Sequence, residues 1–274
     1  MSYQSGPTSN PGLAFRKILR RLIASPDEDP DVSGDLKPEV AGLPMPSGAD
    51  VDKAIAVTGI VGGALIATLV AVGAWVYDAV TEDDGVAGLD RPVLDWAISA
   101  RTPSNEFWIA AFTNLGRTVP MVVLGVALTC AIYLRWRRRT AWVLMLVAAA
   151  GSICFTLVGK PAFARTRPPL GDAVPPYEDS FSFPSGHTLN STVVAGMLAY
   201  LVVWLSTVMW VRVAAVLAAA VWAVPMGLSR VFLGHHWLTD VMFGWAVGLA
   251  WLALLITVHQ TLLHLRAKRR PASG

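Results

Sequence analysis

The sequence predicts an all-α membrane protein, a polytopic bundle of six transmembrane helices. Composition gives the first indication, because 54% of the 274 residues are hydrophobic and only 15% are charged, whereas about 25% of an ordinary soluble domain is charged. The distribution of the hydrophobic residues along the chain gives the second indication. Hydrophobic residues gather in several long stretches separated by short polar or basic segments, and about 20 apolar residues suffice for a helix that crosses a bilayer. The protein is therefore expected to have several spans rather than one anchor.

The first 52 residues contain no span and are expected to form a largely disordered tail. Residues 1–12 are rich in Ser, Gly and Pro, and residues 25–50 combine Pro, Gly and acidic residues without apolar periodicity. Between them, residues 13–24 (LAFRKILRRLIA) show the pattern of a short basic amphipathic helix that could lie on anionic lipid. A loosely ordered basic tail that only reinforces membrane orientation accounts for the same pattern.

The predicted membrane domain, residues 53–265, contains the spans and one surface segment. Residues 90–116 follow the first span and have the character of short amphipathic surface helices. Trp96 and Trp108 lie in this segment, and Trp is enriched at membrane interfaces. Each span is predicted where a stretch of apolar residues is long enough to cross the hydrocarbon core as a helix. They are expected over residues 54–80, 118–134, 141–159, 188–207, 210–228 and 238–263.

Basic residues beside the spans predict the orientation of the chain. Arg dominates the short loop at residues 135–139, and further Lys and Arg lie in residues 16–21 and in the expected C-terminal tail, residues 266–274. Such residues are enriched on the cytoplasmic side of membranes. With six spans, both tails and this loop share one side. We therefore expect cytoplasmic termini and an extracytoplasmic location for the opposite ends of the spans.

Three polar clusters interrupt the apolar pattern at these extracytoplasmic ends. Lys160 and Arg167 follow the third span, residues 184–187 open the fourth, and residues 229–240 join the fifth to the sixth. A single cation in such a place is more often a span-end residue that reaches the lipid headgroups. Because ionisable groups are costly inside a bilayer, their accumulation at one face indicates a functional site.

The residue types in these clusters suit the binding of phosphate. Lys160, Arg167 and Arg230 supply positive charges, and the planar guanidinium of Arg matches phosphate oxygens. Ser185 and Gly186 open the fourth span, where the free backbone N–H groups of a helix N-terminus can bind an anion. Ser185 could equally be a helix cap. Together these donors would stabilise the charge on a phosphoryl group in its transition state.

Two histidines are candidates for making and breaking the bonds to phosphorus. His236 and Asp240 are four residues apart, so the carboxylate could hold one ring N–H and leave the other ring nitrogen free to attack phosphorus. His187 would protonate the leaving oxygen and later deprotonate the water that resolves a phosphohistidine. This mechanism needs no metal or other cofactor. A metal cluster that also includes His235 is conceivable, but the sequence lacks a local ligand motif for one.

The three clusters resemble the signature of the type 2 phosphatidic acid phosphatase (PAP2) superfamily. The resemblance covers residues 160–240, and the span arrangement extends it over residues 54–263. It implies a helical core shared with vanadate-dependent haloperoxidases, with phosphate bound by the Lys, Arg, Ser, Gly and His of the motifs, His187 as the acid and His236 as the nucleophile oriented by Asp240. The motifs are Lys160-x6-Arg167-Pro168, Pro184-Ser185-Gly186-His187 and Ser229-Arg230-x5-His236-x3-Asp240.

From these residues and this resemblance we expect a membrane lipid phosphatase. Its substrate would be a phosphate monoester or pyrophosphate of a lipid, such as phosphatidic acid, phosphatidylglycerophosphate or undecaprenyl pyrophosphate. The loop at residues 165–183, with Tyr177, Glu178, Asp179 and Phe181, is expected to cover the headgroup site, but it does not identify the lipid.

Two alternative functions are compatible with the same residues. The same phosphohistidine could pass its phosphoryl group to an alcohol, which would make the protein a lipid phosphotransferase. The cations could instead guide an anionic lipid through a transporter. Lipids are the only partners that the sequence indicates: the net charge is only +3 and the basic residues lie at span ends, so nucleic-acid binding has no support. The oligomeric state is open.

Overall fold

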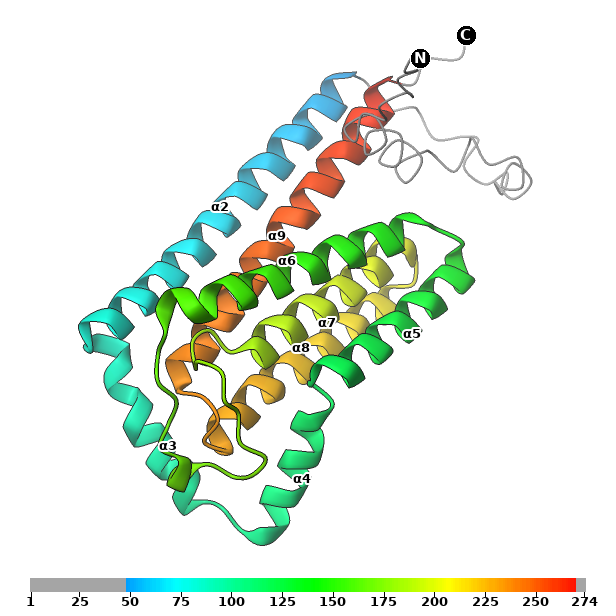
Figure 1. Ribbon diagram of the computed structural model, residues 1–274. Coiled ribbons are helices and arrows are strands. Elements are labelled where there is room, and N and C mark those ends of the chain that lie inside the picture. The colour runs from blue at the N-terminus through cyan, green and yellow to red at the C-terminus, as the bar shows by residue number, and fades with distance from the viewer. Residues whose placement is uncertain (1–47, 270–274) are drawn as a thin grey trace, which may run out of the picture.

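A computed structural model describes residues 48–269, and every regular element within that range is a helix (Figure 1). The expected amphipathic helix at residues 13–24 and the last residues, 270–274, lie outside the described residues. Within the described range, six helices are long and apolar enough to cross a membrane, which confirms the predicted fold class. They are α2 (Gly48–Glu82), α5 (Thr118–Trp136), α6 (Thr140–Phe163), α7 (Gly186–Leu205), α8 (Met209–Phe232) and α9 (Leu238–Arg269).

The first and the last of these helices along the chain, α2 and α9, are longer than the apolar spans predicted for them. α2 begins at Gly48, inside the segment expected to belong to the tail, and α9 continues to Arg269, inside the expected tail of residues 266–274. Near these ends, Lys268 Nζ lies 2.5 Å from Asp52 Oδ1. Apolar length marks the part of a helix that suits the hydrocarbon core, whereas backbone hydrogen bonding can continue into polar residues beyond it.

The segment after α2 consists of short helices, as expected. They are η3 (Gly85–Leu89), α3 (Asp90–Ser99) and α4 (Pro103–Asn114), and a further short helix, η4 (Leu170–Asp172), lies in the loop between α6 and α7. A reciprocal capping box starts α4: Asn105 N–H donates to Thr102 Oγ1 at 3.3 Å, and Thr102 N–H donates to Asn105 Oδ1 at 2.8 Å. Trp96 and Trp108 are exposed on α3 and α4, where they can meet a membrane interface.

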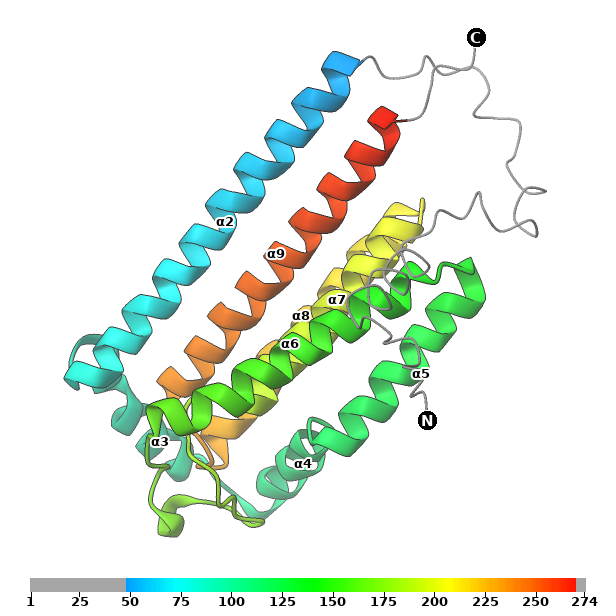
Figure 2. The ribbon, with the colours of Figure 1, turned by 45° about the horizontal axis from the view of Figure 1, so that its top comes forward.

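Helix α7 is the centre of the bundle. It contacts α5, α6, α8 and α9, and its Leu189, Val193, Met197 and Leu201 are fully buried. α2 lies outside this group and packs mainly along α9 (Figures 1 and 2). Because α7 is enclosed on several sides, the polar residues at its N-terminus lie in the interior of the protein rather than against lipid.

The two ends of the bundle differ in character. One end holds α3, α4, the α6–α7 loop and the turn that leads from α8 into α9 (Figure 2). The opposite end holds the α5–α6 turn, with its Arg residues, and the basic C-terminal part of α9. The fold therefore separates the basic loops from the polar clusters, as the span count requires.

Candidate active site

The three polar clusters meet at one end of the bundle. Contacts between the α6–α7 loop, the start of α7, the end of α8 and the start of α9 bring together all the site residues expected from the sequence. These residues are Lys160, Arg167, Ser185, Gly186, His187, Arg230, His236 and Asp240.

A tight turn between α8 and α9 positions His236. Gly234 has a positive φ of 71°, and a side chain there would meet the carbonyl oxygen of Asp172, so only glycine suits this position. The turn lets the backbone N–H groups of His235 and His236 both donate to the carbonyl of Arg230, at 2.9 and 3.2 Å. The His236 side chain is thereby fixed in the interior, where only 1% of it is exposed.

His236 is oriented by Asp240, which lies in the first turn of α9. Nδ1 of His236 is 3.3 Å from Oδ2 of Asp240, and the same carboxylate oxygen accepts from the backbone N–H of Trp237 at 3.0 Å. The other ring nitrogen, Nε2, is 3.2 Å from Nη1 of Arg167. One nitrogen thus faces a buried carboxylate and the other faces a cation of the expected phosphate site, a geometry compatible with the expected role of His236 as an oriented nucleophile.

Two further residues, Arg165 and Ser182, hold Asp240, and Asp90 holds Arg165 in turn; none of these three was predicted from the sequence. Arg165 Nη1 donates to Asp240 Oδ1 at 2.6 Å, and Arg165 Nη2 donates to Asp90 at 2.7 Å. Ser182 Oγ donates to Asp240 Oδ2 and lies 3.3 Å from Nδ1 of His236. Burial lowers the pKa of Arg165, but the carboxylates of Asp240 and Asp90 outweigh this and raise it above its ordinary value. The carboxylate that orients His236 is therefore itself paired and hydrogen-bonded.

Arg167 and Arg230 face the same carboxylate, that of Glu178. Oε2 of Glu178 accepts from Arg167 Nη2 at 2.8 Å, and Oε1 accepts from Arg230 Nη2. Burial alone would raise the pKa of Glu178, but the positive charges beside it, chiefly that of Arg230, overcome this effect and lower the pKa to about 2. Glu178 is thus ionised at neutral pH. If the two guanidinium groups bind phosphate as expected, the phosphate oxygens would replace the carboxylate oxygens of Glu178.

Arg230 is almost entirely buried and is held by α4 as well as by Glu178. Its Nη1 donates to Thr113 Oγ1 at 3.2 Å, and Ser229 Oγ donates to the same hydroxyl at 3.0 Å. Nε of Arg230 has no hydrogen-bond partner among residues 48–269. The surface helix α4 therefore reaches into the site through Thr113, and the Arg230 guanidinium keeps an unused donor.

Lys160 and Arg167 fasten the α6–α7 loop over the site. Lys160 Nζ donates to Ser180 Oγ at 2.9 Å and to the carbonyl of Phe181 at 2.6 Å, and Arg167 Nε donates to the carbonyl of Ser180 at 2.6 Å. The side chains of Tyr177 and Phe181 are exposed on this loop. These contacts support the expectation that residues 165–183 cover the site.

Ser185 and Gly186 serve the start of α7 in different ways. Ser185 is the N-cap: its Oγ accepts from the backbone N–H of Thr188 at 3.5 Å and from Thr188 Oγ1 at 2.9 Å. Gly186 lies so close to α6 that an added Cβ would be 2.9 Å from a methyl carbon of Thr156. The cap and the glycine together bring the N-terminal N–H groups of α7 to the site.

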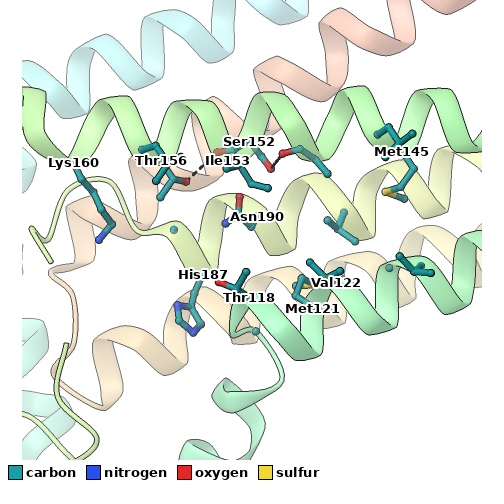
Figure 3. Close-up of a pocket in the computed structure, with 18 of the residues that line it drawn as sticks. Thr118, Met121, Val122, Met145, Ser152, Ile153, Thr156, Lys160, His187 and Asn190 are labelled. Carbon is teal, nitrogen blue, oxygen red and sulfur yellow. Dashed lines mark hydrogen bonds between the residues drawn. The ribbon is translucent and has the colours of Figure 1, made fainter. Parts of the chain in front are cut away.

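The three histidines of this region have different surroundings. His187 Nε2 is buried and has no hydrogen-bond partner in the described part of the chain, and the ring lines a cavity (Figure 3). His235 Nε2 is 2.6 Å from the carbonyl oxygen of Val174 in the α6–α7 loop, and burial lowers its pKa to about 4. Burial, Arg167 and Arg230 hold the pKa of His236 well below its ordinary value. His236 is therefore neutral at neutral pH, as an attacking nitrogen must be.

Comparison with known proteins decides the family. The model of the PAP2 superfamily matches residues 139–263. Phosphatidylglycerophosphatase B of Bacillus subtilis (strain 168) is 31% identical over 172 residues, which are 62% of this chain and 83% of that protein. The chain belongs to the PAP2 superfamily. The resemblance deduced from the three motifs is thereby confirmed, and this PAP2 protein is a membrane hydrolase of phosphate esters.

A solved structure of a PAP2 protein agrees with the fold. The crystal structure of a transmembrane PAP2-type phosphatidylglycerolphosphate phosphatase from Bacillus subtilis superposes with a TM-score of 0.62 at 27% identity, over 72% of this chain and 95% of that one. The crystal structure of LpxE from Aquifex aeolicus matches with a TM-score of 0.44 at 18% identity, over 65% of this chain and 95% of that one.

A cavity of about 520 Å³ begins at the PAP2 motifs and continues between α5, α6 and α7 (Figure 3). Lys160, Glu178, His187 and His236 line its polar end. Its lining is apolar over most of the remaining length, down to Met145 on α6. In residues 48–269 no three His, Cys, Asp or Glu side chains are grouped so that they could hold a metal ion.

Proposed function

We propose that this PAP2 protein hydrolyses the phosphate monoester of a membrane lipid through a phosphohistidine formed on His236. The carrying observation is the placement of His236 between Asp240 on one ring nitrogen and Arg167 on the other, at the polar end of a long apolar cavity. Phosphate would bind among Lys160, Arg167 and Arg230, and the lipid would extend away from them into the cavity.

In the first step, Nε2 of His236 attacks phosphorus while the bond from phosphorus to the lipid oxygen breaks. Asp240 keeps the proton on Nδ1 and stabilises the positive charge that develops on the ring. His187 gives a proton to the departing oxygen. In the second step a water attacks the phosphohistidine, His187 takes up its proton, and inorganic phosphate leaves with His236 restored. The guanidinium groups and the N–H groups at the start of α7 stabilise the equatorial oxygens in both steps.

The cavity supports a lipid substrate rather than a soluble ester. Met121 and Val122 of α5 and Met145 of α6 line it. From Lys160 to Met145, α6 rises about 22 Å at 1.5 Å per residue, which is a large part of the hydrocarbon thickness of a bilayer. An alkyl chain in this cavity would lie parallel to the helices while its phosphate stays at the polar end. The relatives named above as phosphatidylglycerophosphate phosphatases make that lipid the first candidate, with phosphatidic acid and undecaprenyl pyrophosphate next.

The opposite, basic end of the bundle supports an orientation with both termini in the cytoplasm and the site on the extracytoplasmic side of a bacterial cytoplasmic membrane. Single cysteines introduced at Ser180 and at Arg138 test this proposal in intact cells, in a background without Cys130 and Cys154. A membrane-impermeant maleimide should label the first position only. Labelling of the second position alone would reverse the orientation.

Phosphate release by the purified full-length protein tests the reaction. We expect wild type to release phosphate from one or more of the three candidate lipids, and His236→Ala to lose more than about 1,000-fold in kcat. His235→Gln is the matched control, because its side chain faces Val174, and it should keep its rate within about tenfold of wild type. Full activity of His236→Ala would contradict the proposal. Lipid transport that survives this substitution would favour a transporter, and phosphate transferred to added glycerol would favour a phosphotransferase.

A further inference from the structure

A belt of uncharged polar side chains crosses the cavity just beyond the phosphate site. Thr118 of α5, Ser152 and Thr156 of α6 and Asn190 of α7 make up this polar belt (Figure 3). The next cavity residues along the same helices are apolar, among them Met121 and Val122. A buried polar group that lacks a hydrogen-bond partner reduces stability, so a belt residue without one requires an explanation other than packing.

Asn190 is the member of the belt with unused hydrogen-bonding capacity. Its Oδ1 is buried and has no hydrogen-bond partner among the described residues. The side chain lies on the cavity side of α7 (Figure 3). A carboxamide can both donate and accept, so Asn190 offers both functions to a molecule in the cavity.

Ser152 and Thr156 present oxygen atoms from the opposite wall. The Ser152 hydroxyl donates to the carbonyl of Ala149, and the Thr156 hydroxyl donates to the carbonyl of Ser152, each at 3.0 Å. Because both protons are engaged within α6, the lone pairs of the two hydroxyl oxygens remain available as acceptors. The belt therefore suits a group that donates a hydrogen bond.

The position of the belt matches the position of the leaving group. Asn190 lies three residues after His187 on the same face of α7, about 4.5 Å deeper at 1.5 Å per residue. In the proposed function, His187 protonates the scissile oxygen. The atoms two or three bonds beyond that oxygen then pass the belt, before the alkyl chain enters the apolar part of the cavity.

We infer that the polar belt is a leaving-group subsite in which Asn190 hydrogen-bonds a free hydroxyl close to the scissile phosphate ester. This inference rests on the proposed function and narrows its substrate to lipids whose phosphate is attached to a polyol, such as a glycerol with an unesterified hydroxyl. A fully esterified glycerol would leave Asn190 without its donor.

The test compares two lipids with the same acyl chains in detergent micelles. Phosphatidylglycerophosphate has a free hydroxyl next to the scissile ester, and phosphatidic acid has none. Replacing Asn190 with Leu, which is similar in size and apolar, should lower kcat/KM for the first lipid about tenfold, as expected for one lost hydrogen bond, and for the second by less than about twofold. Thr129→Val is the matched control: this hydroxyl is also buried without a partner among the described residues, but it does not line the cavity.

A second measurement needs no variant. Wild type should hydrolyse a deoxy analogue of phosphatidylglycerophosphate, in which hydrogen replaces the free hydroxyl, with a kcat/KM about tenfold lower than the parent lipid. Equal values for parent and analogue, or an equal loss on both lipids in Asn190→Leu, would overturn the subsite while leaving the proposed function intact. Wild type that releases phosphate from no lipid would overturn both.

Discussion

The two halves of the active site are prepared to different degrees. On the nucleophile side, His236 and Asp240 are buried, and Arg165 and Ser182 already hold the carboxylate. On the phosphate side, Arg167 and Arg230 are engaged by the loop residue Glu178. Under the proposed function, the His236–Asp240 pair is therefore already oriented, whereas Arg167 has to leave Nε2 of His236 and both arginines have to leave Glu178 before phosphate can bind. Substitutions on the first side should alter kcat, and those on the second should alter anion affinity.

Arg165 should show the largest effect on the nucleophile side. Its guanidinium joins Asp240 to Asp90, so Arg165→Met would leave two buried carboxylates without their shared cation. We expect kcat to fall about 10- to 100-fold with little change in KM, because Arg165 acts through Asp240 and does not reach the substrate. Arg165→Lys, which keeps the charge, should recover part of kcat. A rise in KM at unchanged kcat would instead assign Arg165 to substrate binding.

Substitution of Glu178 should have a smaller effect, and it should alter the binding of phosphate rather than kcat. Glu178→Gln removes the charge that competes with phosphate for Arg167 and Arg230, so the inhibition constant of inorganic phosphate should fall about tenfold. Asp179→Asn is the matched control, because it removes the same charge from the same loop and forms no ion pair with either arginine. Equal shifts in the two variants would show that the net charge of the loop, rather than the position of Glu178, sets anion affinity.

The pH dependence of stability should report the same ion pairs of Glu178. The pKa of Glu178 falls to about 2 in the folded protein, against about 4.3 in an unfolded chain. Its ion pairs therefore contribute stability above the unfolded value and lose it as pH falls toward 2, by at most about 3 kcal/mol. Between pH 6 and pH 3, wild type should lose more unfolding free energy than Glu178→Gln, measured in detergent by denaturant unfolding. Parallel pH profiles would contradict this contribution.

Features that depend on residues close together in the chain could be predicted from the sequence. Apolar length predicts each span because a helix must cross a bilayer of fixed thickness. The spacing of the three motifs predicts the phosphate ligands and the His236–Asp240 pair, because Asp240 is close to His236 along the chain. These features depend on local order in the sequence, and the structure contains the spans and brings the motif residues together.

The residues that hold Asp240 and Arg230 in place are brought there by tertiary contacts, so their roles could not be predicted from the sequence. Asp90 meets Arg165 only because α3 folds against the start of α9, and Thr113 meets Arg230 only because α4 lies beside α8. Arg165 is the exception that offered a signal, since it lies two residues before Arg167 in a basic segment. The sequence places Glu178 in a covering loop, but its position between two arginines follows from the folded path of that loop.

The covalent intermediate tests the central claim most directly. Full-length protein should be mixed with a lipid phosphate that carries a radiolabel on phosphorus, quenched within one turnover, and digested to locate the label. The account predicts a label that is stable to base, labile to acid, attached to His236 and absent from His236→Ala, in which His187 and His235 remain. Label on another residue, or phosphate release from wild type without labelled protein at any time within the first turnover, would contradict it.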